Sequence, residues 1–286
     1  MPQFFPNIIT QCFSENKILS VNAIGGGCIN ETYCVQVDSG QKYFVKINDI
    51  KQKDNFIQEK FNLDYLKNKS SLKVPDVTQI CEHQNKVALV LEYLEKSVEN
   101  NEFHFLFGKG LAELHKNTES FFGWFQDNYI GSLKQLNKRI SEWDEFFATQ
   151  RLEPLVKECF DKSILSKSDV RAFENLYNEL KNIFPDEPPA LLHGDLWTGN
   201  RMNTTQGAAI FDPACYFGCR EMDIAMLHLF GNVPVDFFDG YNSVYLLEKN
   251  FRDRIDICNL YPLLVHAVLF GYSYIYDIKR IIKKFQ

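Results

Sequence analysis

The sequence predicts an α+β protein of two lobes, a small strand-rich lobe over residues 1–95 and a larger, mainly helical lobe over residues 96–286. Three observations lead to this prediction. Apolar and polar residues alternate in short runs before residue 95, and apolar residues recur at helical spacing from about residue 103. One strand-and-loop segment, at residues 190–212, interrupts the helical region. A chain of 286 residues is long enough to build a core in each lobe.

The first lobe contains several strand-like runs and one helical segment. The runs "ILSVNAI" (18–24), "QKYFVKIN" (41–48) and "KVALVLEYL" (86–94) are typical of strands, and another β-type run follows the loop "GGGCIN" (25–30). The segment "NFIQEKFNLDYLKN" (55–68) repeats its apolar residues near helical spacing. We therefore expect a sheet and one helix in this lobe.

The second lobe begins with the helical pattern "FHFLFGKGLAELHKN" (103–117). In "LLHGDLWTGN" (191–200) the leucines indicate the end of a buried strand and the glycines indicate a loop. The next segment, "RMNTTQGAAIFD" (201–212), is typical of a hairpin with its turn at residues 203–207. The stretch "LYPLLVHAVLFGYSYIY" (260–276) has the look of a tail anchor, but its Pro, His and Gly residues and its short length favour a buried helix.

Composition excludes several classes of function. The net charge is −6 and no basic stripe stands out, so we expect no nucleic-acid partner. The eight cysteines form no CxxC pair, which gives a zinc site no support. The N-terminus, "MPQFFPNIITQ", lacks the basic and long apolar regions of a leader, so we expect a cytoplasmic protein without membrane attachment. The oligomeric state does not follow from the sequence.

One strand of the first lobe carries a lysine where a buried side chain is expected. In "QKYFVKIN" the residues Tyr43, Val45 and Ile47 share one face, and Lys46 lies on the other. If both faces are covered, the buried ammonium group needs a partner. Glu59, thirteen residues further on in the predicted helix, is a candidate; the alternative is a surface lysine and an unrelated glutamate.

The glycine-rich loop between the first two strands is a candidate phosphate site. Gly25, Gly26 and Gly27 would let backbone N–H groups approach a phosphate closely, although ordinary turns also use glycine freely. Cys28 follows in the same loop. N–H dipoles around an exposed thiol favour its thiolate form, so we hypothesise that oxidation of Cys28 reversibly lowers activity; the alternative is a passive thiol.

Asp195 and Asn200 lie five residues apart on the loop that follows the second lobe's buried strand. Alone they would fit a polar turn. However, the order of a glycine-rich turn, a strand lysine, a helix glutamate, an apolar strand and a D-x-x-x-x-N loop is the ground plan of a protein kinase. The hairpin after Asn200 would return Asp212 beside it, and the two side chains would then bind magnesium through oxygen atoms.

The sequence also departs from protein kinases, because it has "HGD" for HRD, "FDPA" for DFG and no APE segment. It resembles the aminoglycoside phosphotransferase-like superfamily of small-molecule kinases, and within it the fructosamine kinase (ketosamine-3-kinase) family. The segments that carry the resemblance cover nearly the whole chain: "GGGCIN", "VPDV", "LVLEYL", "FGWFQDNYIGSLKQLN", "WDEFFATQRLEPL", "LLHGDLWTGN", "IFDPACYFGCREMDIAM" and "YPLLVHAVLFG".

The resemblance implies a role for individual residues on the nucleotide side. Lys46 would hold the α- and β-phosphates of ATP, with Glu59 orienting it. The backbone at Glu92 and Leu94, at the end of the "LEYL" strand, would hydrogen-bond adenine. Asp195 would be the catalytic base that accepts the proton of the sugar hydroxyl, and the cofactors would be ATP and Mg²⁺.

On the acceptor side the substrate would be a free or protein-bound ketosamine, and the candidates for contacting it are Asp127, Asn128 and Trp197. His266 fits a core histidine better than a ligand. Val265 and Val268 stand where the family commonly has asparagines, and Thr198 replaces a more usual glycine or serine, which puts the acceptor preference in doubt.

Two alternative functions remain open from the sequence. A relative that phosphorylates an aminoglycoside or another small hydroxyl compound would use the same chemistry. The net charge of −6 does not exclude a cationic acceptor, but the segments "DNYIG" and "GDLW" argue against this alternative. A catalytically silent nucleotide-binding or scaffold protein would share the fold. The five kinase-like side chains argue against a silent protein, since such a protein would usually have lost at least one of them.

Overall fold

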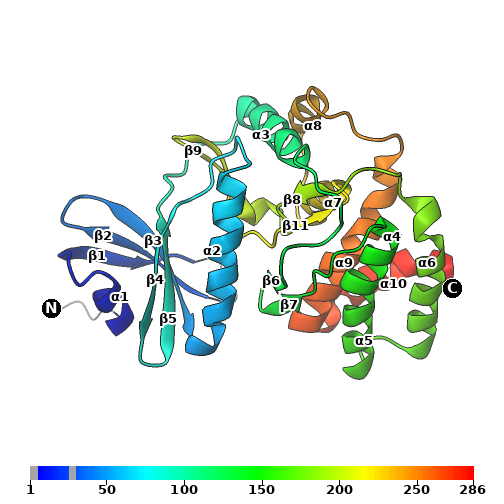
Figure 1. Cartoon of the computed structure of the whole chain (residues 1–286), viewed down its shortest axis with the longest axis horizontal. Coiled ribbons are helices and arrows are strands. Elements are labelled where there is room, and N and C mark those ends of the chain that lie inside the picture. Colours follow the sequence, from blue (N-terminus) through cyan, green and yellow to red (C-terminus); the bar gives the residue numbers. More distant parts are fainter. Residues whose placement is uncertain (1–5, 26–29) are drawn as a thin grey trace. The chain divides into compact units, whose positions relative to one another are not determined.

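The computed structural model describes residues 6–25 and 30–286, and their contacts divide the chain into two compact units (Figure 1). The first unit comprises Met1–Glu99 and Met202–Asp212, and the second comprises Asn100–Arg201 and Pro213–Gln286. Residues 202–212 therefore belong by contact to the first unit, although in sequence they lie in the middle of the second.

The first unit is built on a five-stranded antiparallel sheet in the order β1-β2-β3-β5-β4. Its elements are α1 (Asn7–Cys12), β1 (Ile18–Ala23), β2 (Glu31–Val37), β3 (Lys42–Asp49), the 3₁₀ turn η1 (Ile50–Gln52), α2 (Lys53–Lys67), β4 (Val77–His83), β5 (Lys86–Glu92), and the later strands β9 (Arg201–Thr204) and β10 (Gly207–Ile210).

The two faces of this sheet are covered by different helices. Val45 and Ile47 of β3 are buried in an apolar cluster with residues of α1, whereas Lys46 points to the opposite face and meets α2. Figure 1 shows α1 and α2 on the two sides of the strands. The alternation read from the sequence of β3 is therefore present, and both faces are covered.

The prediction of a single helix in this unit was wrong, because α1 precedes the sheet. This helix has only six residues, and its N-cap residue, Pro6, makes no side-chain capping bond. Ile8 and Ile9 are buried against the sheet, so burial rather than local pattern accounts for the helix. A segment this short contains too few residues to show a helical period.

The hairpin of β9 and β10 is fastened to the first unit by backbone hydrogen bonds. Ile210 donates to the carbonyl of Lys73 at 2.9 Å, and Ser97 donates to the carbonyl of Asn203 at 2.8 Å. The turn is tighter than predicted. Thr204 ends β9 and Gly207 begins β10, because the Thr204 hydroxyl donates to the Gly207 carbonyl at 2.7 Å and closes the turn at residues 205–206.

The second unit is mainly helical. Its elements are α3 (Asn101–His115), β6 (Asn128–Ile130), β7 (Leu133–Gln135), α4 (Trp143–Phe146), the π-helical segment η2 (Phe147–Leu152), α5 (Glu153–Asp161), α6 (Lys167–Ile183), β8 (Ala190–Leu192), the 3₁₀ turn η3 (Thr198–Asn200), β11 (Tyr216–Gly218), α7 (Glu221–Leu229), α8 (Val235–Asn242), α9 (Phe251–Phe270), η4 (Tyr272–Tyr274), α10 (Ile275–Ile282) and η5 (Lys283–Phe285).

Two short strand pairs interrupt these helices, β6 with β7 and β8 with β11. The sequence predicted only the interruption at residues 190–212, so the β6–β7 pair and strand β11 were missed. Each of these strands has three residues, which is too short to show alternation.

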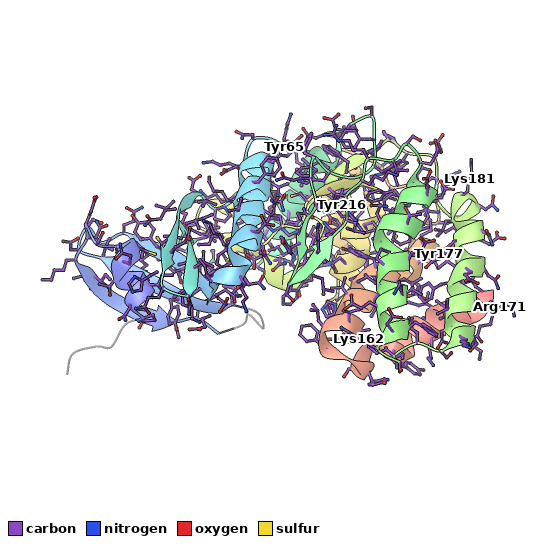
Figure 2. All side chains as sticks on the ribbon, turned by 60° about the horizontal axis from the view of Figure 1, so that its bottom comes forward. Tyr65, Lys162, Arg171, Tyr177, Lys181 and Tyr216 are labelled. Atoms are coloured by element: carbon purple, nitrogen blue, oxygen red, sulfur yellow. The ribbon has the colours of Figure 1, made fainter. Side chains whose placement is uncertain are left out.

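Helix α6 shows how local sequence sets an element of this unit. Ser166 and Asp169 form a reciprocal capping box at its start, and the apolar residues on one face, among them Phe173, are buried. In Figure 2 the side chains of Arg171 and Lys181 on the same helix lie at its outer edge. The charged residues therefore mark the solvent face of the helix.

The apolar segment that resembled a tail anchor begins in the middle of α9. This helix starts earlier, at Phe251, and is buried over most of its second half. The expected buried helix is confirmed for residues 260–270, whereas residues 271–276 lie outside α9, and Tyr272 and Tyr276 are exposed. Gly271, at φ 83°, ends the helix. Within the described residues no helix has both the length and the apolar character needed to cross a membrane.

Helices α3 and α8 approach each other through glycines. A Cβ atom at Gly240 of α8 would lie 2.0 Å from the carbonyl oxygen of Phe105, and one at Gly108 of α3 would lie 2.1 Å from the carbonyl oxygen of Phe237. Both obstacles are backbone atoms, which cannot move aside as a flexible side chain can. The helix pair therefore requires glycine at both positions.

We expect Gly240→Ala to destabilise the second unit by about 2 kcal/mol or more, because the added methyl group must push two helices apart. The midpoint of urea-induced unfolding measures the change. Gly25→Ala is the control, since a Cβ atom there meets nothing within 4 Å. An unchanged midpoint for Gly240→Ala would contradict the close helix packing.

Candidate active site

Lys46 forms a buried charged cluster with two carboxylates. Its side chain is 4% exposed, and its Nζ lies 2.6 Å from Oε1 of Glu59 and also donates to Oδ1 of Asp212. Burial alone would lower the pKa of Lys46, but the charges of Asp212 and Glu59 outweigh burial and raise this pKa. Burial raises the pKa of Glu59, against the opposing effect of Lys46. The structure thus brings together the lysine and glutamate paired by sequence reasoning, and adds Asp212.

Asp212 reaches this cluster because the β9–β10 hairpin is fastened to the first unit. Only Phe211 separates the end of β10 from Asp212, which adopts a left-handed backbone conformation at φ 59°. Aspartate tolerates this region better than most residues do. This backbone conformation directs the carboxylate of Asp212 at Lys46. The sequence did not predict the contact between Asp212 and Lys46.

The glycine-rich loop is described only at its base. Thr32 donates its hydroxyl to the carbonyl of Ile24 at 2.6 Å, and Asn48 donates its side-chain amide to Asn30 at 2.7 Å. These bonds hold the two ends of the hairpin, and Gly25 is exposed just beyond one of them. Gly26, Gly27 and Cys28 lie outside the described residues, so the predictions for them stay predictions.

The predicted adenine-binding segment lies at the end of β5. The backbone N–H of Glu92 donates to the carbonyl of Asp76 at 2.8 Å, and its carboxylate is paired with Lys73 at 2.7 Å. A contact from Glu92 to adenine would therefore come from its carbonyl oxygen. Leu94 is buried, with 7% of its surface exposed.

The loop that carries Asp195 is shaped by Gly194 and by the β8–β11 pair. Gly194 has φ 84°, and a Cβ atom at this position would lie 2.0 Å from the carbonyl oxygen of Ala214. Ala214 in turn donates its backbone N–H to the carbonyl of His193 at 2.9 Å. The glycine of "HGD" is therefore required by the backbone of the segment that follows Asp212.

Asp195 and Asn200 meet across this loop. The Nδ2 of Asn200 donates to the backbone carbonyl of Asp195 at 2.8 Å and to its Oδ2 at 3.0 Å. Trp197 packs its ring over Gly199, where a Cβ atom would approach the indole to 2.2 Å. The five-residue spacing thus closes a loop in which the asparagine fixes the orientation of the aspartate.

A buried carboxylate that sequence reasoning did not assign anchors this loop. Asp223 of α7 is 1% exposed; its Oδ2 accepts from the backbone N–H of His193 at 2.7 Å, and its Oδ1 accepts from that of Gly194 at 2.9 Å. His115 of α3 donates from Nε2 to the same carboxylate at 3.2 Å, and its Nδ1 lies 2.8 Å from the hydroxyl of Tyr241. The one sequence feature that could have indicated this role is the position of Asp223 inside the apolar segment "MDIAMLHL".

The acceptor candidates Asp127 and Asn128 are held in different ways. Asn128 is fully buried and donates its amide to the carbonyl of Cys215 at 2.8 Å, while its Oδ1 accepts from Gln135 at 2.7 Å and from Asn137 at 2.8 Å. Asp127, with a side chain 35% exposed, pairs with Lys134 at 3.1 Å. Asn128 therefore positions the segment after Asp212 rather than presenting a free amide.

Trp197 and His266 lie in one aromatic neighbourhood. The ring of Trp197 is 6.2 Å from that of Phe230, which is 5.1 Å from His266. Nδ1 of His266 donates to the carbonyl of Pro262 at 2.7 Å, and burial lowers its pKa. His266 is only partly buried, so it is not the core histidine that the sequence favoured.

The predicted magnesium ligands fit a hard cation chemically. No group of three or more His, Cys, Asp or Glu side chains that could hold a metal occurs within residues 6–25 and 30–286, so a cation would depend on substrate phosphates as well. Because Nδ2 of Asn200 makes both bonds to Asp195, Oδ1 is the atom that would face a cation. Asp212 offers a carboxylate 41% exposed. The two residues belong to different units, so their joint binding stays a prediction.

Comparison with solved structures defines the class. An aminoglycoside phosphotransferase solved with ADP and hygromycin B superposes with a TM-score of 0.65, covers 97% of each chain and is 14% identical, a likeness that establishes the fold alone. The α+β, protein-kinase-like fold expected from the sequence is confirmed. The class of the protein is therefore the protein-kinase-like fold.

The family follows from closer relatives. The family model for fructosamine kinase matches residues 2–286, and the chain belongs to this family. A protein of Vibrio parahaemolyticus named "probable ketoamine kinase" is 39% identical over 273 residues, which are 94% of this chain and 93% of that protein. The crystal structure of a fructosamine-3-kinase candidate from Haemophilus somnus 129PT has a TM-score of 0.87 and 28% identity, and covers 98% of this chain and 97% of its own.

We expect Asp223→Asn to lower both stability and turnover. An asparagine has one acceptor oxygen, so its amide NH₂ would face at least one of the N–H donors that Asp223 now accepts, at a cost of about 2–3 kcal/mol. Thermal unfolding and steady-state turnover measure the two effects. Asp239→Asn, an exposed position on α8, is the control and should change neither. Parent-like turnover in Asp223→Asn would show that the loop does not depend on this carboxylate.

Proposed function

We propose that the protein transfers the γ-phosphoryl group of ATP to the hydroxyl on the third carbon of a ketosamine, the rearranged adduct of a sugar with an amine. The observation that carries this proposal is Asp195, oriented by Asn200 on a loop anchored to buried Asp223, in a chain of the fructosamine kinase family. Relatives named as ketoamine kinases support the acceptor class.

On the donor side, solved structures of the same fold contain ADP or an ATP analogue, which supports ATP as the phosphoryl donor. Lys46, held by Glu59, would neutralise the α- and β-phosphates, and the glycines of residues 25–27 would approach them through backbone N–H groups. The carbonyl of Glu92 and the backbone of Leu94 would contact adenine. Magnesium, held by Asn200 and Asp212, would neutralise charge on the phosphates.

On the acceptor side, Asp195 would accept the proton of the sugar hydroxyl as that oxygen attacks the γ-phosphorus. The bond from the γ-phosphorus to the bridging oxygen breaks, and ADP leaves. Such a reaction requires mainly positioning and charge stabilisation, which a fixed loop supplies. Trp197 and Asp127 would contact the sugar, and Asn128 would act through the backbone at Cys215.

The product of this transfer would decompose without further catalysis. The carbonyl on the second carbon allows enolisation towards the first, and phosphate then leaves the third carbon by elimination. The conjugated imine that results takes up water and releases the amine and a deoxy-dicarbonyl sugar. We propose deglycation of amines, free or as protein lysines, in the cytoplasm as the outcome.

Two substitutions separate the chemical step from nucleotide binding. Asp195→Asn should lower turnover by about 10²–10⁴-fold and leave nucleotide affinity largely intact, because the base acts on the acceptor. Asp212→Asn should instead weaken magnesium-dependent nucleotide binding. Turnover assays and calorimetric titration with an ATP analogue measure both. Near-normal turnover in Asp195→Asn would remove this residue from the mechanism.

A glycated lysine or short glycated peptide should gain one phosphoryl mass when incubated with the enzyme, ATP and magnesium. After the enzyme is removed, the product should revert to the unmodified amine and release inorganic phosphate in equal amount. Mass spectrometry follows both changes. A phosphorylated product that survives prolonged warm incubation would contradict the third-carbon assignment, and turnover on aminoglycosides alone would contradict the acceptor class.

A further inference from the structure

A run of aromatic side chains begins two residues after Asp195 and extends to the surface of the second unit. We call it the aromatic cluster; its members are Trp197, Phe230, His266, Phe270 and Tyr274. Adjacent rings are close, since His266 lies 5.7 Å from Phe270 and 4.9 Å from Tyr274. Phe230 is 38% exposed and Phe270 is 48% exposed. The cluster therefore presents aromatic side chains to solvent beside the loop that carries Asp195.

The cluster is built on the same supports as the catalytic loop. Phe230 directly follows α7, the helix that carries Asp223. The next residue, Gly231, packs against the loop so closely that a Cβ atom there would lie 2.7 Å from Cγ2 of Thr198. The position of the rings is therefore tied to that of Asp195 by direct packing and by a shared helix.

His266 gives this apolar surface one polar atom of defined character. A carbonyl oxygen can only accept, so the bond to Pro262 fixes the hydrogen of the imidazole on Nδ1. In the neutral ring Nε2 is then an acceptor. Because burial lowers the pKa of His266, the ring stays neutral at neutral pH and does not repel a cation.

We propose that the aromatic cluster binds the amine half of the acceptor, with the protonated secondary nitrogen donating to Nε2 of His266 and its hydrocarbon substituent packed on Phe230 and Phe270. This inference rests on the proposed function, which places the sugar at Asp195. A ketosamine carries its positive nitrogen only two bonds from the carbonyl carbon, so the substituent must leave the site close to the sugar. Ring faces attract both an ammonium group and the hydrocarbon next to it.

The subsite predicts an amine preference that the parent enzyme alone can reveal. Fructose adducts of methylamine, n-hexylamine and benzylamine share one sugar and differ only in the substituent. We expect the KM of the hexylamine and benzylamine adducts to lie roughly 3- to 10-fold below that of the methylamine adduct, with similar kcat. Equal KM values for the three adducts would overturn the proposal. Phosphorylation of none of them would overturn the proposed function instead.

Variants then locate the preference on named side chains. Phe230→Ala and Phe270→Ala should each remove most of the KM advantage of the larger adducts and leave kcat and the methylamine adduct within about twofold of the parent. His266→Leu should raise KM for all three adducts, and His266→Gln, which keeps an acceptor, should restore part of the loss. The KM for ATP should stay unchanged in every variant.

Phe61→Ala is the matched control, because Phe61 is 37% exposed and lies on α2 of the first unit. It should keep the amine preference of the parent. If Phe230→Ala and Phe270→Ala lower kcat, or raise KM equally for small and large amines, the cluster only supports the loop and the proposal is overturned. Thermal unfolding confirms that the compared variants are folded, and the amine series on the parent decides the question for any that are not.

Discussion

The requirement that a buried ammonium group be paired organises the whole first unit. Lys46 lies on a covered face of the sheet, where an unpaired charge would be strongly unfavourable. Its two carboxylate partners come from α2 and from the segment after β10, so one charge joins the sheet, a helix and a hairpin that is distant in sequence. Residues 202–212 contact the first unit for this reason as well as through their backbone bonds to Lys73 and Ser97.

The second unit also contains a buried charge that needs partners, and here the charge is negative. The carboxylate of Asp223 is buried, and its cost is offset by donors from the backbone of the loop and from His115. Since two of these donors are the N–H groups immediately before Asp195, the buried charge fixes the loop rather than merely tolerating its surroundings. The geometry of the candidate base therefore depends on residues in α3, α7 and α8, which are distant from Asp195 in the sequence.

Glycines allow the close packing around the loop that carries Asp195. Gly194 admits the backbone at Ala214, Gly199 admits the ring of Trp197, and Gly231 admits Thr198. Each contact leaves no room for a side chain, so the loop, the segment after Asp212 and the end of α7 pack as one layer. The aromatic cluster lies at the edge of this layer, which explains how its rings can be held in place while remaining partly exposed.

Local patterns in the sequence were sufficient to predict those site residues whose positions follow from strand alternation, helical spacing or a short motif. Alternation in β3 placed Lys46 opposite Val45 and Ile47, the helical period placed Glu59 within its reach, and the spacing of Asp195 and Asn200 set the size of a loop that one asparagine could close. The segments that identified the family were likewise contiguous in the sequence.

Other features depended on contacts between distant segments, which have no local period. Nothing near Asp223 in the sequence indicates that His193 and Gly194 donate to it, nothing near Asn128 indicates that it is buried against Cys215, and Asp212 pairs with Lys46 across 166 positions. The three-residue strands and the six-residue α1 are too short for a pattern and form because packing buries them. The sequence alone determined which groups could perform the chemistry, and the tertiary structure decided which buried charges and close backbone contacts hold them, because burial is set by the whole chain.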